Sequence, residues 1–296
     1  MKLAGFASRL AAYFGLLVLF SVAGQFAASL LPRGALGWVD LGMMTVAALL
    51  AASLVLARLD HRPPGALGFS LDASAPRELV AGIAIGGALI LTASVLLFLT
   101  GTAGFVSDFG TIPGYAWMLA WSLLFFILAA AYEEILFRGY PFQLLTRVFG
   151  RWPAVLISSA AFSGVHAWNP DIDALAFANI FLAGVLLALA YLRTRSLWFA
   201  TAVHAGWNWT MATLIGFPVS GLTTIDTPLY DAVERGADWW TGGGFGPEAG
   251  LAATGALLVG ILWMIRTDRL RDSPRMAALS PLVERWPTAR RDHGAA

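Results

Sequence analysis

The chain has 296 residues but no cysteine, a single lysine and very little charge of either sign. Without cysteine, disulfides, thiolate metal ligands and a cysteine nucleophile are excluded. Asp, Glu, Lys and Arg make up only 12% of the residues, against roughly 25% in an ordinary soluble domain. Hydrophobic residues reach 58%, and the mean hydropathy is +0.71. A soluble globular protein is therefore excluded. The net charge of +1 also gives no sign of a nucleic-acid partner, which would require a clustered basic face.

Long apolar runs replace the missing charge, and they predict an all-α membrane protein built as a polytopic helical bundle. A helix needs ~20 residues to cross a hydrocarbon core of ~30 Å. Eight stretches are candidate spans, the fifth and the eighth only with help from flanking residues: 10–31, 38–57, 79–99, 115–137, 153–165, 174–192, 197–217 and 250–265. We expect one transmembrane bundle over residues 1–265 and a charged, mobile cytoplasmic tail over residues 266–296.

The distribution of basic residues gives an independent test of this count. With the N-terminus inside, 17 of the 19 Lys and Arg residues fall in cytoplasmic segments, and only Arg33 and Arg235 fall outside. Cytoplasmic loops of membrane proteins carry such an excess of Lys and Arg. The pattern predicts eight spans with both termini in the cytoplasm. A secretory signal is an alternative reading of the first span, although its apolar run is long for one. The preference for Arg, with abundant Ala and Gly, suggests a bacterial plasma (inner) membrane.

Polar side chains gather in three of the predicted spans, where each needs an explanation. A charged group at a helix centre costs roughly 2.5 to 3.5 kcal/mol on insertion scales. The three groups lie at the end of the fourth span, in the fifth and in the seventh: Glu133, Glu134 and Arg138; Phe162 and His166; His204 and Asn208. An interfacial charge or an interhelical hydrogen bond would explain any one of them alone. Their occurrence together on three helices favours a functional site.

Helical spacing indicates which of these residues act together. Residues four apart share a face of a helix, whereas neighbours diverge by about 100°. His204 and Asn208 therefore point the same way, and Glu134 can pair with Arg138. Glu133 points elsewhere and needs a partner on another helix.

Depth in the membrane gives a second constraint, at ~1.5 Å of rise per residue. His204 is expected ~12 Å and His166 ~20 Å below the cytoplasmic boundary. Glu133 reaches a similar depth only if its helix continues toward residue 144, with Gly139 and Pro141 bending it rather than ending it. We then expect the polar groups to converge in a cavity open to the cytoplasm.

These residue types together point to peptide hydrolysis. A desolvated carboxylate is tuned toward general-base work on a water, which fits Glu133. His166 is suited to hold the same water or to return its proton to the leaving amine. Donors on His204 and Asn208 are suited to stabilise the oxyanion. Two histidines and Glu133 are also a possible zinc set with an open position. We expect no metal, because a carboxamide such as Asn208 is a poor zinc ligand and a good oxyanion donor.

The sequence lacks the motifs of other classes of protease. The sequence has no His-Glu-x-x-His helix and no Gly-x-Ser-x-Gly turn, which zincins and serine hydrolases of the α/β type use. Aspartates fall in loops or at span ends, so no intramembrane aspartate pair is available. Ser163 fits a small packing residue better than a nucleophile.

The three ordered motifs, Glu133-Glu134 with Arg138, Phe162 with His166, and His204 with Asn208, resemble those of the CAAX-protease and bacteriocin-processing (CPBP, or Abi) family. The resemblance covers about a quarter of the chain. It implies a glutamate-dependent intramembrane endopeptidase of eight helices, similar to the type II CAAX prenyl endopeptidases. By this similarity Glu133 and His166 activate water, and His204 and Asn208 form the oxyanion site. Glu134, Arg138 and Phe162 support the structure of the site.

The resemblance leaves the substrate open. It implies a peptide or protein substrate reached from the membrane or the cytoplasm, with the lipid bilayer as the surrounding partner and no nucleic acid. Some relatives act in bacteriocin immunity or as membrane scaffolds, so a non-proteolytic role is the alternative from another class. A transporter fits less well, because the buried polar groups gather at one site rather than along a path.

Overall fold

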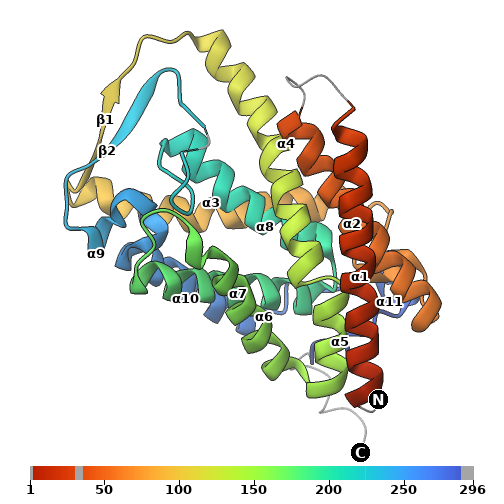
Figure 1. The fold of residues 1–296 in the computed structure, drawn as a ribbon. Helices are drawn as coiled ribbons and strands as arrows, with labels where there is room; N and C mark the ends of the chain where they lie inside the picture. Colours follow the sequence, from red (N-terminus) through yellow and green to blue (C-terminus); the bar gives the residue numbers. More distant parts are fainter. Residues whose placement is uncertain (1–2, 31–35, 224, 288–296) are drawn as a thin grey trace, which may run out of the picture.

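The computed structural model describes residues 3–30, 36–223 and 225–287 of the chain. Most of this part is helical (Figure 1). The helices longer than one or two turns are α1 (Leu3–Ala28), α2 (Leu36–Leu59), α3 (Ala75–Leu99), α4 (Ile112–Phe137), α5 (Tyr140–Phe149), α6 (Arg151–Val165), α7 (Ala174–Thr194), α8 (Leu197–Trp209) and α10 (Leu251–Arg266). Two short helices follow in the C-terminal part, α9 (Asp238–Thr241) and α11 (Pro274–Leu279).

Five helical stretches in the described residues are long and apolar enough to cross a membrane. They are 3–28, 39–59, 75–99, 112–149 and 174–194. The helices α6, α8 and α10 are shorter, with 15, 13 and 16 residues. The chain is therefore a mostly helical, multi-pass membrane protein, and the count of eight spans stays a prediction.

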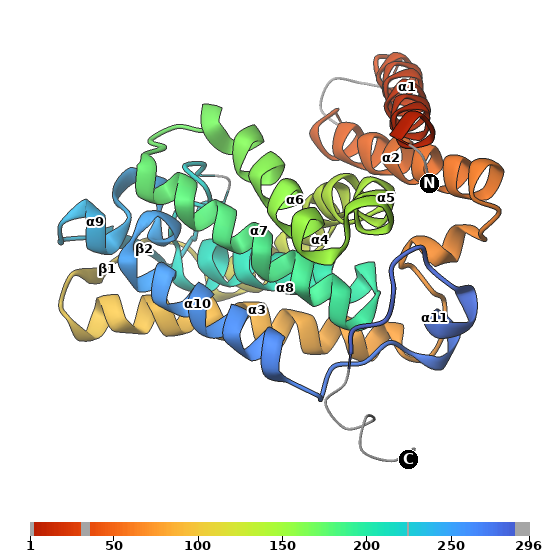
Figure 2. The ribbon, with the colours of Figure 1, turned by 90° about the horizontal axis from the view of Figure 1, so that it is seen from below.

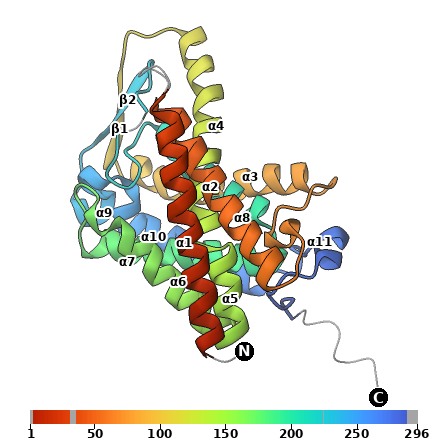
Figure 3. The same cartoon turned by 45° about the vertical axis from the view of Figure 1, so that its right-hand side comes forward.

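Two sets of helices cross at a steep angle in the bundle. In Figures 1 and 3, α1, α2 and α4 run from top to bottom, whereas α3, α7, α8 and α10 run across them. Figure 2 views α1 and α4 along their axes and the second set from the side. The hairpin of α1 and α2 lies at one edge, next to α5. The crossing of the two sets brings the end of α4 onto the middle of α8.

Glycines bring α3 and α8 into backbone contact. A Cβ atom added at Gly86 would lie 1.9 Å from the carbonyl oxygen of Val203, and one added at Gly206 would lie 2.4 Å from that of Ile83. Gly82, one turn before Gly86, faces Ala202 in the same way. Small residues spaced four apart allow membrane helices to approach this closely. The position of α8, which carries His204 and Asn208, is thus fixed by α3.

The helix α4 ends at Phe137 and a new helix, α5, begins at Tyr140, whereas the sequence predicts one bent helix. Residue Arg138 caps α4, Gly139 adopts a non-helical ψ of −133°, and α5 restarts at Tyr140 with Pro141 in its first turn. Proline is well tolerated in a first turn because its missing N–H would have no partner there. Glu133 therefore lies in the last turns of α4.

A pair of short strands was not expected from the sequence. A short antiparallel pair, β1 (Ala103–Ser107) with β2 (Tyr230–Glu234), joins segments far apart in the chain, so the expected all-α architecture is not strictly correct. Five-residue strands in an otherwise apolar sequence carry no clear alternation by which to recognise them. The pair lies beside the upper end of α4 (Figure 3).

Much of the expected mobile tail packs against the bundle. Arg195 and Arg285 both pair with Asp272, and Gln143 accepts a hydrogen bond of 3.0 Å from the backbone of Leu282. Burial raises the pKa of the Asp272 carboxyl, but the hydrogen bonds from Arg285 and Arg195 outweigh it and keep the pKa below its usual range. The short helix α11 lies within this segment. The last part of the tail, 288–296, and residues 1–2 lie outside the described residues.

Candidate active site

The two adjacent glutamates at the end of α4 have different surroundings. Glu134 is fully buried and lies 3.1 Å from the guanidinium of Arg138, as their spacing of four residues predicts. The same guanidinium donates a 3.0 Å hydrogen bond to the carbonyl of Gly184 on α7. The side chain of Glu133 is 30% exposed, and its nearest ionisable partner is His204 on α8, at 3.9 Å. Glu134 is thus part of a buried ion pair, and Glu133 is the carboxylate available to a ligand.

The ring of Phe162 on α6 connects the ion pair to the two histidines. The guanidinium carbon of Arg138 lies 4.4 Å from the centre of this ring. The rings of His166 and His204 lie 4.7 Å and 5.9 Å from it, centre to centre. A buried cation over an aromatic face gains up to about 2 kcal/mol. Phe162 therefore acts as a common packing surface for the polar groups of α4, α6 and α8.

His204 lies between the two glutamates. Its Nδ1 is 2.9 Å from Oε1 of Glu134, and its Nε2 is 3.9 Å from Oε2 of Glu133. A carboxylate accepts hydrogen bonds only, so Nδ1 of His204 carries a proton. The other nitrogen is consequently the one that faces Glu133. His204 supplies the contact from another helix that Glu133 lacks within its own.

His166 caps the C-terminus of α6 and is held in the same manner. Its Nδ1 lies 2.7 Å from the carbonyl oxygen of Phe162, which requires a proton on this nitrogen as well. In both histidines an acceptor thus engages Nδ1 and leaves Nε2 available. Carboxylate or carbonyl partners commonly fix the tautomer of functional histidines in this way.

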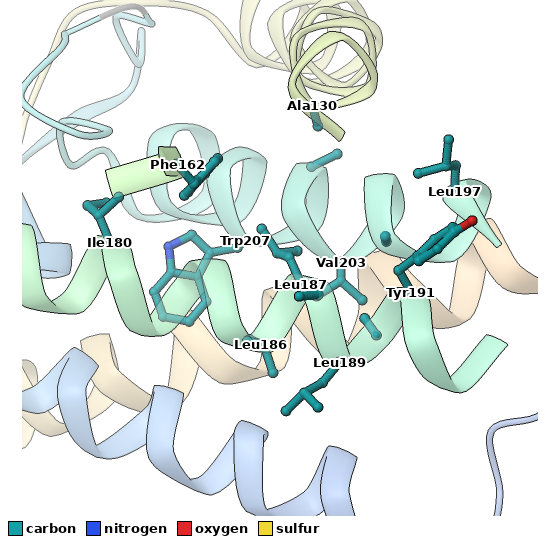
Figure 4. Close-up of a cluster of buried hydrophobic side chains, with 14 of the residues drawn as sticks. Ala130, Phe162, Ile180, Leu186, Leu187, Leu189, Tyr191, Leu197, Val203 and Trp207 are labelled. Carbon is teal, nitrogen blue, oxygen red and sulfur yellow. The ribbon is translucent and has the colours of Figure 1, made fainter. Parts of the chain in front are cut away.

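All four predicted catalytic residues line one cavity of about 180 Å³. Its polar walls are formed by Glu133, His166, Asn169, His204, Asn208, Ser220 and Glu248, with Trp207 beside them. The other walls are apolar and come from α4, α6, α7, α8, α10 and the segment after α8. Figure 4 shows five of the lining side chains: Phe162 on α6, Ile180 and Leu187 on α7, and Val203 and Trp207 on α8. A mostly apolar cavity with a few convergent polar groups is typical of a ligand site.

An acceptor inside this site lacks a donor. Oε2 of Glu133 is buried and has no hydrogen-bond partner among the described residues. Its distance of 3.9 Å from Nε2 of His204 exceeds the usual hydrogen-bond range of ~2.7 to 3.2 Å. A buried carboxylate oxygen without a donor costs free energy unless a ligand or water supplies one. The geometry suits a water held by Glu133.

No pattern in the sequence indicates that Glu248 and Ser220 belong to this cavity. Both lie in the segment between α8 and α10, which the sequence predicts as an external loop. A lone glutamate after a glycine-rich stretch matches no motif, and its contact with α8 depends on the fold. Trp207 also lines the cavity and donates a hydrogen bond to Glu248.

A comparison with protein families matches this part of the chain. The family model for type II CAAX prenyl endopeptidase Rce1-like proteins matches residues 115–210. The family resemblance is confirmed. The Rce1-like segment runs from α4 through α8 and contains all seven residues of the three motifs, and it covers about a third of the chain. No curated protein sequence matches the chain significantly. This match supports a CAAX-type membrane protease in general terms.

Proposed function

We propose that this protein is an intramembrane endopeptidase that hydrolyses a peptide bond with a water activated by Glu133 and His166. The observation that carries the proposal is the unpartnered Oε2 of Glu133, in a cavity that His166, His204 and Asn208 also line. A general base must be within hydrogen-bond reach of the water from which it takes a proton. With Nδ1 bound to the carbonyl of Phe162, His166 has Nε2 available to hold this water or to protonate the leaving amine.

The oxyanion of the tetrahedral intermediate is stabilised by His204 and Asn208. Both residues lie on one face of α8 and line the cavity. Glu134 accepts a hydrogen bond from the protonated Nδ1 of His204. The negative charge of Glu134 favours a second proton, on Nε2 of the same ring. His204 can then donate from Nε2 to the developing negative charge, as a preorganised oxyanion donor does. The ion pair with Arg138 keeps Glu134 in place for this task.

Substitution of the oxyanion donors tests this proposal. We expect His204→Ala and Asn208→Ala each to lower kcat by about 10² to 10³, because each removes one donor from the developing oxyanion. The assay uses purified protein in liposomes with a library of quenched fluorogenic peptides. Products released by the wild type are then identified by mass spectrometry.

The same preparation tests the prediction that no metal takes part. Among the described residues, no three His, Asp or Glu side chains are grouped as a metal site. We expect cleavage to persist after exhaustive chelation, with zinc well below one ion per chain. One zinc ion per chain in the wild type, lost together with activity in His166→Ala, would contradict the metal-free mechanism. Recovery of activity when metal is added would then support a zinc-dependent mechanism.

The proposed arrangement in the membrane has eight spans, with both termini in the cytoplasm of a bacterial cell. We expect a reporter fused after Arg195 to be cytoplasmic and one fused within residues 223–240 to be external. Leu222, which is 49% exposed and lines the cavity, lies close to the second fusion site. Because the chain has no cysteine, a single Leu222→Cys can be labelled with an impermeant maleimide without background.

We expect Leu222→Cys to be labelled by a maleimide added outside the cell. Such labelling would mean that one wall of the cavity is on the external side of the membrane. Access of substrate from the cytoplasm stays a prediction. If both reporters are on the same side of the membrane, the eight-span arrangement is wrong.

A further inference from the structure

A second carboxylate lines the proposed active-site cavity, and the mechanism above does not use it. Glu248 is buried, with only 6% of its surface exposed. It lies more than a hundred residues after Glu133 and outside the segment that matches the family. Buried carboxylates are rare unless they are paired or hydrogen-bonded. The contacts of Glu248 therefore indicate what keeps it there.

Donors on two segments hold both oxygens of Glu248. Oε1 accepts a 2.9 Å hydrogen bond from the indole of Trp207. Oε2 accepts hydrogen bonds of 2.7 Å and 2.8 Å from the backbone N–H and the hydroxyl of Ser220. Asn169 donates to the carbonyl of Ser220 at 2.9 Å and so holds this residue from the other side. The carboxylate is fixed against a cavity wall with little freedom to turn.

The hydrogen bonds to Glu248 favour its ionised form. A carboxylate only accepts hydrogen bonds, and three donors surround this one. Burial has the larger effect and leaves the pKa of the Glu248 carboxyl above its usual range, while the hydrogen bonds from Ser220 and Trp207 limit this shift. The negative charge also interacts with His166 across the cavity. No ion pair of Glu248 with Arg or Lys is present among the described residues.

We propose that Glu248 is a positioning residue that stabilises the positively charged form of His166 during turnover. This inference rests on the proposed function, because His166 is positively charged while it holds the proton that Glu133 has taken from the attacking water and that passes to the leaving amine. The other charged or titratable groups around the cavity are Glu133 on α4 and His204 on α8, and Arg138 and Glu134 lie behind Phe162. Arg138 opposes a positive charge on His166, and the negative charge of Glu248 in the same cavity compensates. A nearby opposite charge favours the charged form of a titratable group.

The test must separate this charge from the three hydrogen bonds. The double variant Ser220→Ala with Trp207→Phe removes the hydroxyl and indole donors and keeps the carboxylate. Glu248→Gln is then added to this background, where its amide no longer meets an indole N–H. We expect kcat to fall by a further factor of about 10 to 100, with KM changed less than twofold, because the charge that stabilises protonated His166 is lost. Measurements use the full chain in liposomes with the fluorogenic peptides.

The effect of Glu248→Gln is also measured in the His166→Ala background, which completes a double-mutant cycle between Glu248 and His166. There we expect Glu248→Gln to have no further effect on residual kcat, since the residue through which it acts is absent. The melting temperature of each variant in detergent reports whether it is folded. If Glu248→Gln leaves kcat unchanged in the double variant, or lowers it equally without His166, then Glu248 serves only as an anchor and the inference is wrong. A wild type that cleaves no peptide would contradict the proposed function instead.

Discussion

Replacement of Glu133 by glutamine is expected to abolish peptide hydrolysis while the protein accumulates in the membrane at the wild-type level. Glutamine keeps the size of the side chain but cannot take a proton from water. Glu133 has no ion pair with Arg or Lys among the described residues, and its side chain is partly exposed. Its buried neighbour His204 keeps the hydrogen bond to Glu134 when the charge of Glu133 is lost. General-base catalysis contributes roughly 10² to 10⁴ in rate. We expect a loss of at least this size in kcat.

Glu284→Gln is the matched control, because Glu284 is exposed in the C-terminal segment and does not line the cavity. This variant should cleave like the wild type. Comparison of membrane peptidomes from cells with the wild type and with Glu133→Gln would identify natural products. A biological effect that survives Glu133→Gln would favour the scaffold or immunity role over proteolysis.

Replacement of Arg138 by alanine is expected to destabilise the fold rather than only the chemistry. Arg138 is fully buried and bonds Glu134 on its own helix and the Gly184 carbonyl on α7. Removal of one partner of a buried pair costs about 3 to 5 kcal/mol, because the other charge stays buried without compensation. We expect less folded protein in the membrane and a lower melting temperature. His204 still donates to Glu134 but is expected to be poorly oriented.

Arg147→Ala provides the control for this experiment. Arg147 also pairs with a carboxylate, that of Asp60 at 2.9 Å, but its own side chain is 44% exposed. Exposed ion pairs contribute about 0 to 1 kcal/mol. Similar losses of folded protein in Arg138→Ala, Arg147→Ala and Glu133→Gln would defeat the division of roles between the two glutamates.

Local spacing in the sequence was enough to predict the parts of the site that lie on one helix. The pairing of Glu134 with Arg138 follows from their distance of one helical turn. The common face of His204 with Asn208 follows in the same way. The cost of burying charge then predicts that such residues meet across helices. Glu133 and His204 are such a pair, because Nε2 of His204 lies 3.9 Å from Oε2 of Glu133. The catalytic roles themselves stay predictions.

The parts that spacing did not predict depend on contacts between distant segments. Glu248 reaches the cavity only because the segment after α8 folds back over it. The break at Gly139 depends on backbone geometry, since a glycine before a proline residue can either bend or end a helix. The packing of the charged tail on Gln143 and Arg195 likewise needs partners that are far away in sequence. Hydropathy and charge alone suggest a free tail there.

The backbone contact between α3 and α8 limits how this protein can be divided or recombined. Gly86 lies outside the Rce1-like segment, yet it touches the turn of α8 that carries His204. A fragment of residues 115–210 would keep every motif residue and lose the surface against which α8 rests. A chimera that received this segment from a relative would meet a foreign α3, whose side chains decide how closely α8 approaches. Exchange of the motif helices should therefore succeed only when α3 is exchanged with them.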